Sequence, residues 1–199
     1  SSNGINKIVR FRTSGPQIAA VAGLTGVEWI EPQVAPVLGN DLAQWVVQTA
    51  GNGSRRVWDM GSKGEGQVVM TSDSGMHTAH NQFRDPLVPI TTWGDYPTHR
   101  KVIAYKQGSN NPAIEFDDHA GASFHGTHTG GTIAGSDDPV GNASAMDGMA
   151  KNAKIYFMDI SGTALANGVD PFSDLNDLFQ PAYTGNAGGA ARISSNSWG

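Results

Sequence analysis

The segment that decides the fold reads Ser123-Phe124-His125-Gly126-Thr127-His128-Thr129-Gly130-Gly131-Thr132-Ile133-Ala134-Gly135. From Thr127 to Ala134 it is a run of mostly small residues, which predicts a tightly packed helix. His125 stands at the start of that helix, and its neighbours have almost no side chains. This histidine can therefore approach other groups closely, which makes it a candidate for chemistry.

Strand-like and helix-like segments alternate on both sides of this helix. The alternation predicts an α/β fold with a mainly parallel sheet flanked by helices. Another helix is expected after Pro171, and Pro181 should kink or end it because proline has no backbone N–H. The interval before His125 leaves room for a long insertion around residues 93–122. The predicted strands cover residues 67–72, 154–160 and 192–197.

The N-terminal segment carries a smaller pattern of its own, so we predict two parts, residues 1–39 and residues 40–199. The proline-flanked stretch 31–39 is the candidate boundary. A helix is expected to begin at Asn40 and to stop at Gly51. Within the first part, strands are predicted at residues 7–12 and 27–30, and a short helix at residues 15–22.

The composition excludes several classes of function. The chain has 13 Lys and Arg residues against 18 Asp and Glu, a net charge of -5, and no basic run. Nucleic acid is therefore a poor candidate as a partner, and no apolar run approaches the length that spans a membrane. There is no cysteine, which excludes disulfides, thiolate zinc sites and cysteine nucleophiles.

Asp73 follows the first predicted strand, at the sheet edge where ligands of open parallel sheets gather. A carboxylate there can accept a hydrogen bond from one imidazole nitrogen of His125 and leave the other nitrogen free as a general base. Histidine ordinarily titrates at about pH 6.5, so it can serve near neutrality. The alternative is that Asp73 is a cap or a surface residue.

The combination of these motifs resembles the subtilisin-like serine proteases. Residues 68–76, together with His80 and Phe83, look like the aspartate motif of that family, and residues 125–135 closely resemble its histidine motif. The resemblance runs from about Trp58 to the end of the sequence, and the form of the last motif suggests the large alkaline subtilases, some of which carry a C-terminal β-domain. Two further segments are similar to family stretches: residues 148–156, and Asn196-Ser197-Trp198-Gly199, which matches the strand lining the substrate cleft.

The resemblance implies a role for each matching residue. Asp73 would orient and stabilise the imidazolium, and His125 would act first as general base and then as acid. Ser197, Trp198 and Gly199 would pair with the backbone of a polypeptide substrate and form one wall of its pocket. Residues 1–39 resemble the tail of a propeptide, which implies a secreted, extracellular enzyme made as a zymogen.

The nucleophile of the family is missing from the sequence. Its Gly-Thr-Ser-x-Ala-x-Pro motif does not occur, and residues 162–166 resemble it only superficially. We therefore expect the chain to hold the front half of a catalytic domain, with a complementary C-terminal chain supplying the serine and the oxyanion asparagine. The alternative is a non-catalytic module that keeps this half of the fold to bind peptides or a partner protease.

Metal ligands are the remaining question. Asp137, Asp138 and Asn142 form an oxygen-rich loop after the histidine helix, which we expect to bind a structural calcium ion, as subtilases often do at this position. The alternative is an ordinary acidic turn. His-x-x-His pairs at 77/80 and 125/128, with His119 and the pair Asp117-Asp118, could suit zinc, but a solvated loop is the simpler interpretation of Asp117-Asp118.

Overall fold

A computed structural model of the chain describes residues 9, 11–32, 40–137, 144–165 and 168–198. The chain divides into two compact units, Ser1–Leu38 and Gly39–Gly199. Each unit is described by itself.

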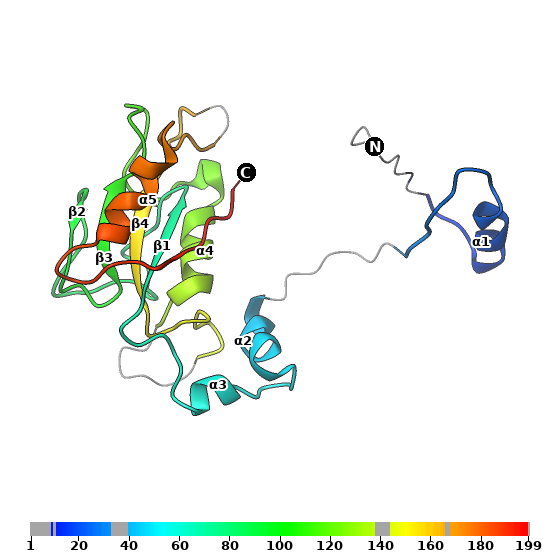
Figure 1. Cartoon of the computed structure of the whole chain (residues 1–199), viewed down its shortest axis with the longest axis horizontal. Coiled ribbons are helices and arrows are strands. Elements are labelled where there is room, and N and C mark those ends of the chain that lie inside the picture. Colours follow the sequence, from blue (N-terminus) through cyan, green and yellow to red (C-terminus); the bar gives the residue numbers. More distant parts are fainter. Residues whose placement is uncertain (1–8, 10, 33–39, 138–143, 166–167, 199) are drawn as a thin grey trace. The chain divides into compact units, whose positions relative to one another are not determined.

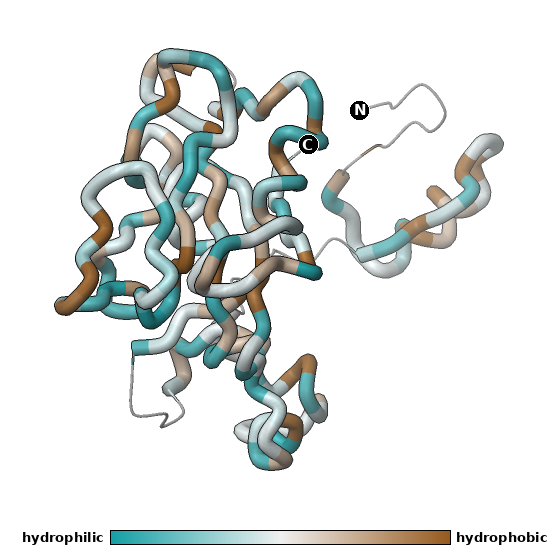
Figure 2. Tube along the Cα trace, turned by 60° about the vertical axis from the view of Figure 1, so that its left-hand side comes forward, coloured by the Kyte–Doolittle hydropathy of each residue, from teal (hydrophilic) through white to brown (hydrophobic). Residues whose placement is uncertain are grey.

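The first unit contains one helix, α1 (Gly15–Ala22), within its described part, and this confirms the helix predicted there. Ser14 and Gln17 form a capping box at its start. Hydrophobic and hydrophilic residues are mixed along the unit (Figure 2), and no residue of α1 is buried. The prediction of a strand at residues 27–30 is wrong, since these residues are not in a strand. The described part of this unit has no second strand that could bond their backbone groups. Of the strand predicted at 7–12, Val9, Phe11 and Arg12 are not in a strand and the rest lies outside the described residues.

The second unit is built on a five-stranded sheet with the order β2-β3-β4-β1-β5 (Figure 1). All neighbouring strands are parallel except β2, which runs antiparallel to β3. This arrangement confirms the predicted α/β fold with a mainly parallel sheet. The strands are β1 (Val68–Asp73), β2 (Gly94–Asp95), β3 (Val102–Gln107), β4 (Lys154–Asp159) and β5 (Ile193–Ser194).

The helices of this unit cover both faces of the sheet. The core cluster that contains Val68 and Met70 of β1 also contains Leu178 of α5, whereas Val69 belongs to the cluster that contains Ala134 of α4. Successive side chains of a strand point to opposite faces, so α4 and α5 lie on opposite sides of β1 (Figure 1). The helices are α2 (Asn40–Thr49), α3 (Arg56–Asp59), α4 (His125–Ala134) and α5 (Leu175–Thr184), with a 3₁₀ turn at Ala120–Ala122.

Three sequence predictions for this unit need correction. Strand β3 lies inside the segment taken as a long insertion, and its run of buried residues from Val102 to Tyr105 places it beside β4. Of the two outcomes predicted at Pro181, a kink or an end, the end is wrong: helix α5 continues to Thr184, and Leu178 and Ala182 on either side of the proline are buried. The last strand is shorter than predicted, because it pairs with β1 only at residues 193 and 194.

Candidate active site

Asp73 ends β1, and the strand places its carboxylate at the carboxyl edge of the sheet. The residue is only 1% exposed. Its Oδ1 accepts a hydrogen bond from the backbone N–H of Ser74 at 2.7 Å, and its Oδ2 accepts one from the hydroxyl of Thr129 at 3.0 Å. The carboxylate is therefore buried from water, and these two hydrogen bonds fix its orientation.

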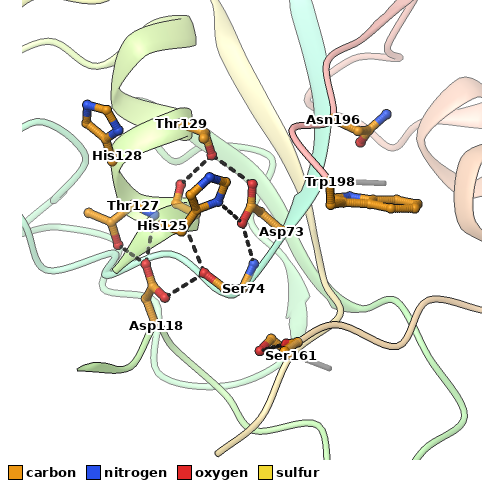
Figure 3. Close-up of polar contacts among 12 residues, drawn as sticks. Asp73, Ser74, Asp118, His125, Thr127, His128, Thr129, Ser161, Asn196 and Trp198 are labelled. Carbon is orange, nitrogen blue, oxygen red and sulfur yellow. Dashed lines mark hydrogen bonds and ion pairs between the residues drawn. The ribbon is translucent and has the colours of Figure 1, made fainter. Parts of the chain in front are cut away.

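His125 is the first residue of α4, and its Nδ1 lies 2.7 Å from Asp73 Oδ1 (Figure 3). An ionised carboxylate can only accept, so Nδ1 carries the proton of this hydrogen bond and the lone pair remains on Nε2. The imidazole side chain is 48% exposed. Nε2 is therefore the nitrogen available to take a proton from a neighbouring group.

Close packing of two glycines brings helix and strand together. A Cβ on Gly126 would lie 2.0 Å from the carbonyl oxygen of Gly75 and 3.0 Å from the Cβ of Asp73. A Cβ on Gly75, whose φ is +100°, would lie 2.1 Å from the carbonyl oxygen of Asp117. Any larger residue at these positions would force α4 or the loop before it away from Asp73.

The turn that leads into α4 has an unusual backbone. Ser123 and Phe124 have φ values of +57° and +53°, in the left-handed region that non-glycine residues seldom adopt. Phe124 occupies the N-cap position and its side chain makes no capping hydrogen bond. Two N–H groups of the first turn are bonded instead by residues outside the helix: Gly126 N–H by Ser74 Oγ at 2.9 Å, and Thr127 N–H by Asp118 Oδ2 at 2.8 Å.

Sequence reasoning predicted that Asp73 and His125 lie together, as the structure shows, but it did not predict the residues that hold them. Thr129 could have been found from its spacing, because residues i and i+4 share a helix face. Ser74 adjoins Asp73, yet nothing in its type predicts a bond to the helix. Asp118 was interpreted as part of a solvated loop, which is wrong: its carboxylate is half-buried and bonded to three other residues.

The segment after β5 continues alongside β1 through side-chain contacts. Ser195 N–H still donates to Met70 O at 2.9 Å, and Asn196 Oδ1 then accepts from both the N–H and the hydroxyl of Ser72. Trp198 is partly buried, packs against the core, and donates its indole N–H to Ser72 O at 2.8 Å. Ser197 is exposed, while Gly199 lies outside the described residues.

Ser161, which follows β4, is not placed as a nucleophile. It is fully buried, its hydroxyl donates to Gly168 O, and it lies 3.1 Å from His119 Nε2. The hydroxyl is therefore already engaged within the loop that follows β4.

Asp159 lies beside Asp73, because the two residues are paired in register at the ends of β4 and β1. It is fully buried and accepts a hydrogen bond from the Tyr105 hydroxyl at 2.7 Å. Burial raises the pKa of Asp159 to about 8, although the hydrogen bonds from Tyr105 and from Ser161 N–H lower it. The Tyr105 hydroxyl also accepts a hydrogen bond from the backbone N–H of Met76. This bond connects the turn after Asp73 to β3.

The structure describes only one of the three residues that were expected to bind calcium. Asp137 is exposed and accepts a hydrogen bond from Ser144 Oγ at 3.3 Å, whereas Asp138 and Asn142 lie outside the described residues. Across the described ranges, no group of three or more His, Asp or Glu side chains is arranged to hold a metal ion. The histidines and aspartates considered for zinc therefore form no such site there.

None of the described helices has the length and apolar character needed to cross a bilayer.

Comparison with known proteins adds the family. The model of the subtilase family matches residues 64–199. A serine protease/ABC transporter B family protein of Dictyostelium discoideum, tagA, is 34% identical over 168 residues, 81% of this chain and 9% of that protein. A second protein of that name and organism, tagD, is 35% identical over 142 residues, 71% of this chain and 7% of the relative. The chain thus spans less than a tenth of the length of these relatives, and no solved structure matches it at a comparable level.

Proposed function

This chain belongs to the subtilase family, and from that premise we propose that it forms part of a serine endopeptidase in which Asp73 and His125 are catalytic. The observation that carries the proposal is the 2.7 Å hydrogen bond from His125 Nδ1 to the buried carboxylate of Asp73. In a neutral imidazole this hydrogen bond places the proton on Nδ1 and leaves the lone pair on Nε2. The names of the curated relatives, which are serine protease family proteins, support the same activity.

The proposed reaction is acyl transfer through a serine. His125 Nε2 takes the proton of a serine hydroxyl as its oxygen attacks the peptide carbonyl carbon, and the buried Asp73 stabilises the imidazolium that forms. The imidazolium then gives this proton to the leaving amine as the C–N bond breaks. A water molecule, deprotonated by the same nitrogen, hydrolyses the acyl-enzyme and regenerates the serine.

We place the serine and the oxyanion asparagine outside these 199 residues, either further along the same polypeptide or in a complementary C-terminal chain. The family motif for the nucleophile is absent from residues 1–199. Within the described residues, Ser161 is buried and already bonded. Ser74 is buried too, and its hydroxyl donates to Asp118.

Ser197, Trp198 and Gly199 are proposed to bind the substrate polypeptide. The structure of the segment supports this, because Asn196 and Trp198 are anchored to Ser72 and hold the exposed Ser197 between them. An extended peptide could add to this edge by backbone hydrogen bonds. Substrate would then be oriented before the chemical step.

Three further features remain proposals on the strength of the family resemblance. Asp137, with Asp138 and Asn142, would supply oxygen ligands to a structural calcium ion. Residues 1–39 would be the tail of a propeptide that keeps the enzyme a zymogen. The mature enzyme would act outside the cell.

The test is complementation. The chain is combined with a polypeptide that carries the rest of the catalytic domain, and hydrolysis of a chromogenic peptide is followed. We expect activity from the combination, and its loss in His125→Ala. Peptide binding without turnover, unchanged by His125→Ala, would instead favour the non-catalytic binding module, and full activity of residues 1–199 alone would contradict the placement of the serine.

A further inference from the structure

The loop at Asp117–Asp118, which precedes the 3₁₀ turn before α4, packs directly on the site. The carbonyl oxygen of Asp117 occupies the space that a Cβ on Gly75 would need. Asp117 itself has a φ of +78°, a backbone conformation that non-glycine residues rarely adopt. This backbone brings the next side chain, Asp118, to the N-terminus of α4 (Figure 3).

The Asp118 carboxylate joins the two elements that carry the catalytic pair. Its Oδ2 accepts hydrogen bonds from the backbone N–H and the hydroxyl of Thr127, at 2.8 and 2.6 Å. Its Oδ1 accepts from the hydroxyl of Ser74 at 3.0 Å. Ser74 in turn accepts the N–H of Gly126 at 2.9 Å. One carboxylate is thus bonded to the helix directly and, through Ser74, to both the helix and the strand end.

These bonds replace a cap that the helix cannot provide for itself. Phe124 stands at the N-cap position, where a side-chain oxygen would normally accept an N–H of the first turn. A negative charge is also favoured at a helix N-terminus by the aligned peptide dipoles. Asp118 meets both requirements from outside the helix, in the loop just before the 3₁₀ turn that precedes α4.

We propose that Asp118 is a positioning residue, which sets the distance and angle between His125 and Asp73 by capping α4 and by holding Ser74. It touches neither the substrate nor the reacting atoms. Its importance for catalysis rests on the proposed function, but its effect on the His125–Asp73 hydrogen bond does not require turnover.

The experiment observes the proton between His125 Nδ1 and Asp73 by ¹H NMR of the whole chain, at low temperature. A strong hydrogen bond to a carboxylate gives such a proton a far-downfield signal. We expect the unmodified chain to show it and Asp118→Ala to lose it. The matched control is Glu115→Ala, because the Glu115 carboxylate also accepts the N–H and the hydroxyl of a threonine, but that threonine is Thr163, in the loop after β4 and outside α4 and β1. Glu115→Ala should keep the signal.

Further variants separate positioning from loss of folding. Asp118→Asn keeps an oxygen for the Thr127 N–H and should restore part of the signal. Ser74→Ala removes the bond to the Gly126 N–H but keeps the bonds of Asp118 to Thr127, and should weaken the signal. In the complemented enzyme, Asp118→Ala should lower kcat by about tenfold to a hundredfold with KM nearly unchanged. The proposal is overturned if folded Asp118→Ala retains the signal, if Glu115→Ala loses it equally, or if the unmodified chain lacks it. Should the signal behave as expected while the complemented enzyme cleaves no peptide, the proposed function fails and the positioning role stands.

Discussion

The two ends of the candidate site are built in different ways. Where β1 meets α4, glycine contacts and partly buried hydrogen bonds fix Asp73 against His125. At the other end, β5 pairs with β1 only at residues 193 and 194. Beyond them the chain is held to β1 by the backbone bond of Ser195 to Met70 and by the bonds of Asn196 and Trp198 to Ser72.

This difference separates two functions. The proposed proton-transfer pair needs a fixed geometry, which the burial of Asp73 and the close glycine contacts between α4 and the strand end provide. The proposed substrate segment is anchored on its β1 side and leaves Ser197 exposed, as a surface that accepts another backbone should. Changes at the β1–α4 junction are therefore expected to have larger effects than changes elsewhere.

The largest effect is expected from Asp73→Asn in the complemented enzyme. An asparagine would hold His125 in the wrong tautomer, because its amide can donate to Nδ1. We expect kcat for peptide hydrolysis to fall by about 10⁴-fold, the size of effect known for the equivalent change in other serine proteases. Asp59→Asn, an exposed carboxylate on α3, is the control and should leave kcat unchanged.

Gly126→Ala tests the packing of α4 on the strand end. Its Cβ would lie 2.0 Å from Gly75 O, so the helix must shift. Unfolding in urea should show a loss of about 3 kcal/mol or more. Gly94→Ala is the control, since its Cβ would meet only Tyr96 at ordinary contact distance. Equal stability of the two variants would show that the close approach is not required.

Asp159, which is paired with Asp73 at the end of β4, is expected to make the free energy of unfolding depend on pH. Its pKa is raised to about 8 from an ordinary value of 3.8, so the folded chain holds a proton that the unfolded chain releases. The stabilisation is complete below about pH 4 and is lost as pH rises through 8. Between pH 6 and 8 the free energy of unfolding should fall by about 2 kcal/mol from this group. Asp159→Asn stays neutral and should remove that part of the slope, and an unchanged slope would contradict the raised pKa.

Thr129→Val makes the smallest change to the pair. It keeps the shape of the side chain but removes the hydrogen bond to Asp73 Oδ2. We expect a loss of about 1 kcal/mol in the free energy of unfolding. Thr132→Val, on the same helix but with its hydroxyl bonded to the His128 carbonyl, is the comparison and should cost less. If both variants unfolded at the same urea concentration, the hydrogen bond from Thr129 to Asp73 would not add the expected stability.

The sequence predicted the parallel sheet, the histidine helix and the closeness of Asp73 to His125, because each rests on a local pattern. The alternation of strands and helices places the carboxyl end of β1 beside the start of α4. Asp118 and β3 were missed for different reasons. Asp118 acts through a loop whose path depends on a positive φ at Asp117, which no local pattern reveals. β3 had a readable apolar run from Val102 to Tyr105, which was assigned to an insertion instead.

The central claim is that residues 1–199 hold a working Asp–His pair and that the serine it activates lies outside them. A fluorophosphonate probe forms a covalent bond with an activated serine, so intact-mass and peptide analysis of the labelled, complemented enzyme identifies that residue directly. The account predicts a single label on a serine beyond residue 199, lost in His125→Ala. A label on a serine within residues 1–199, or a label beyond them that persists in His125→Ala, would contradict it.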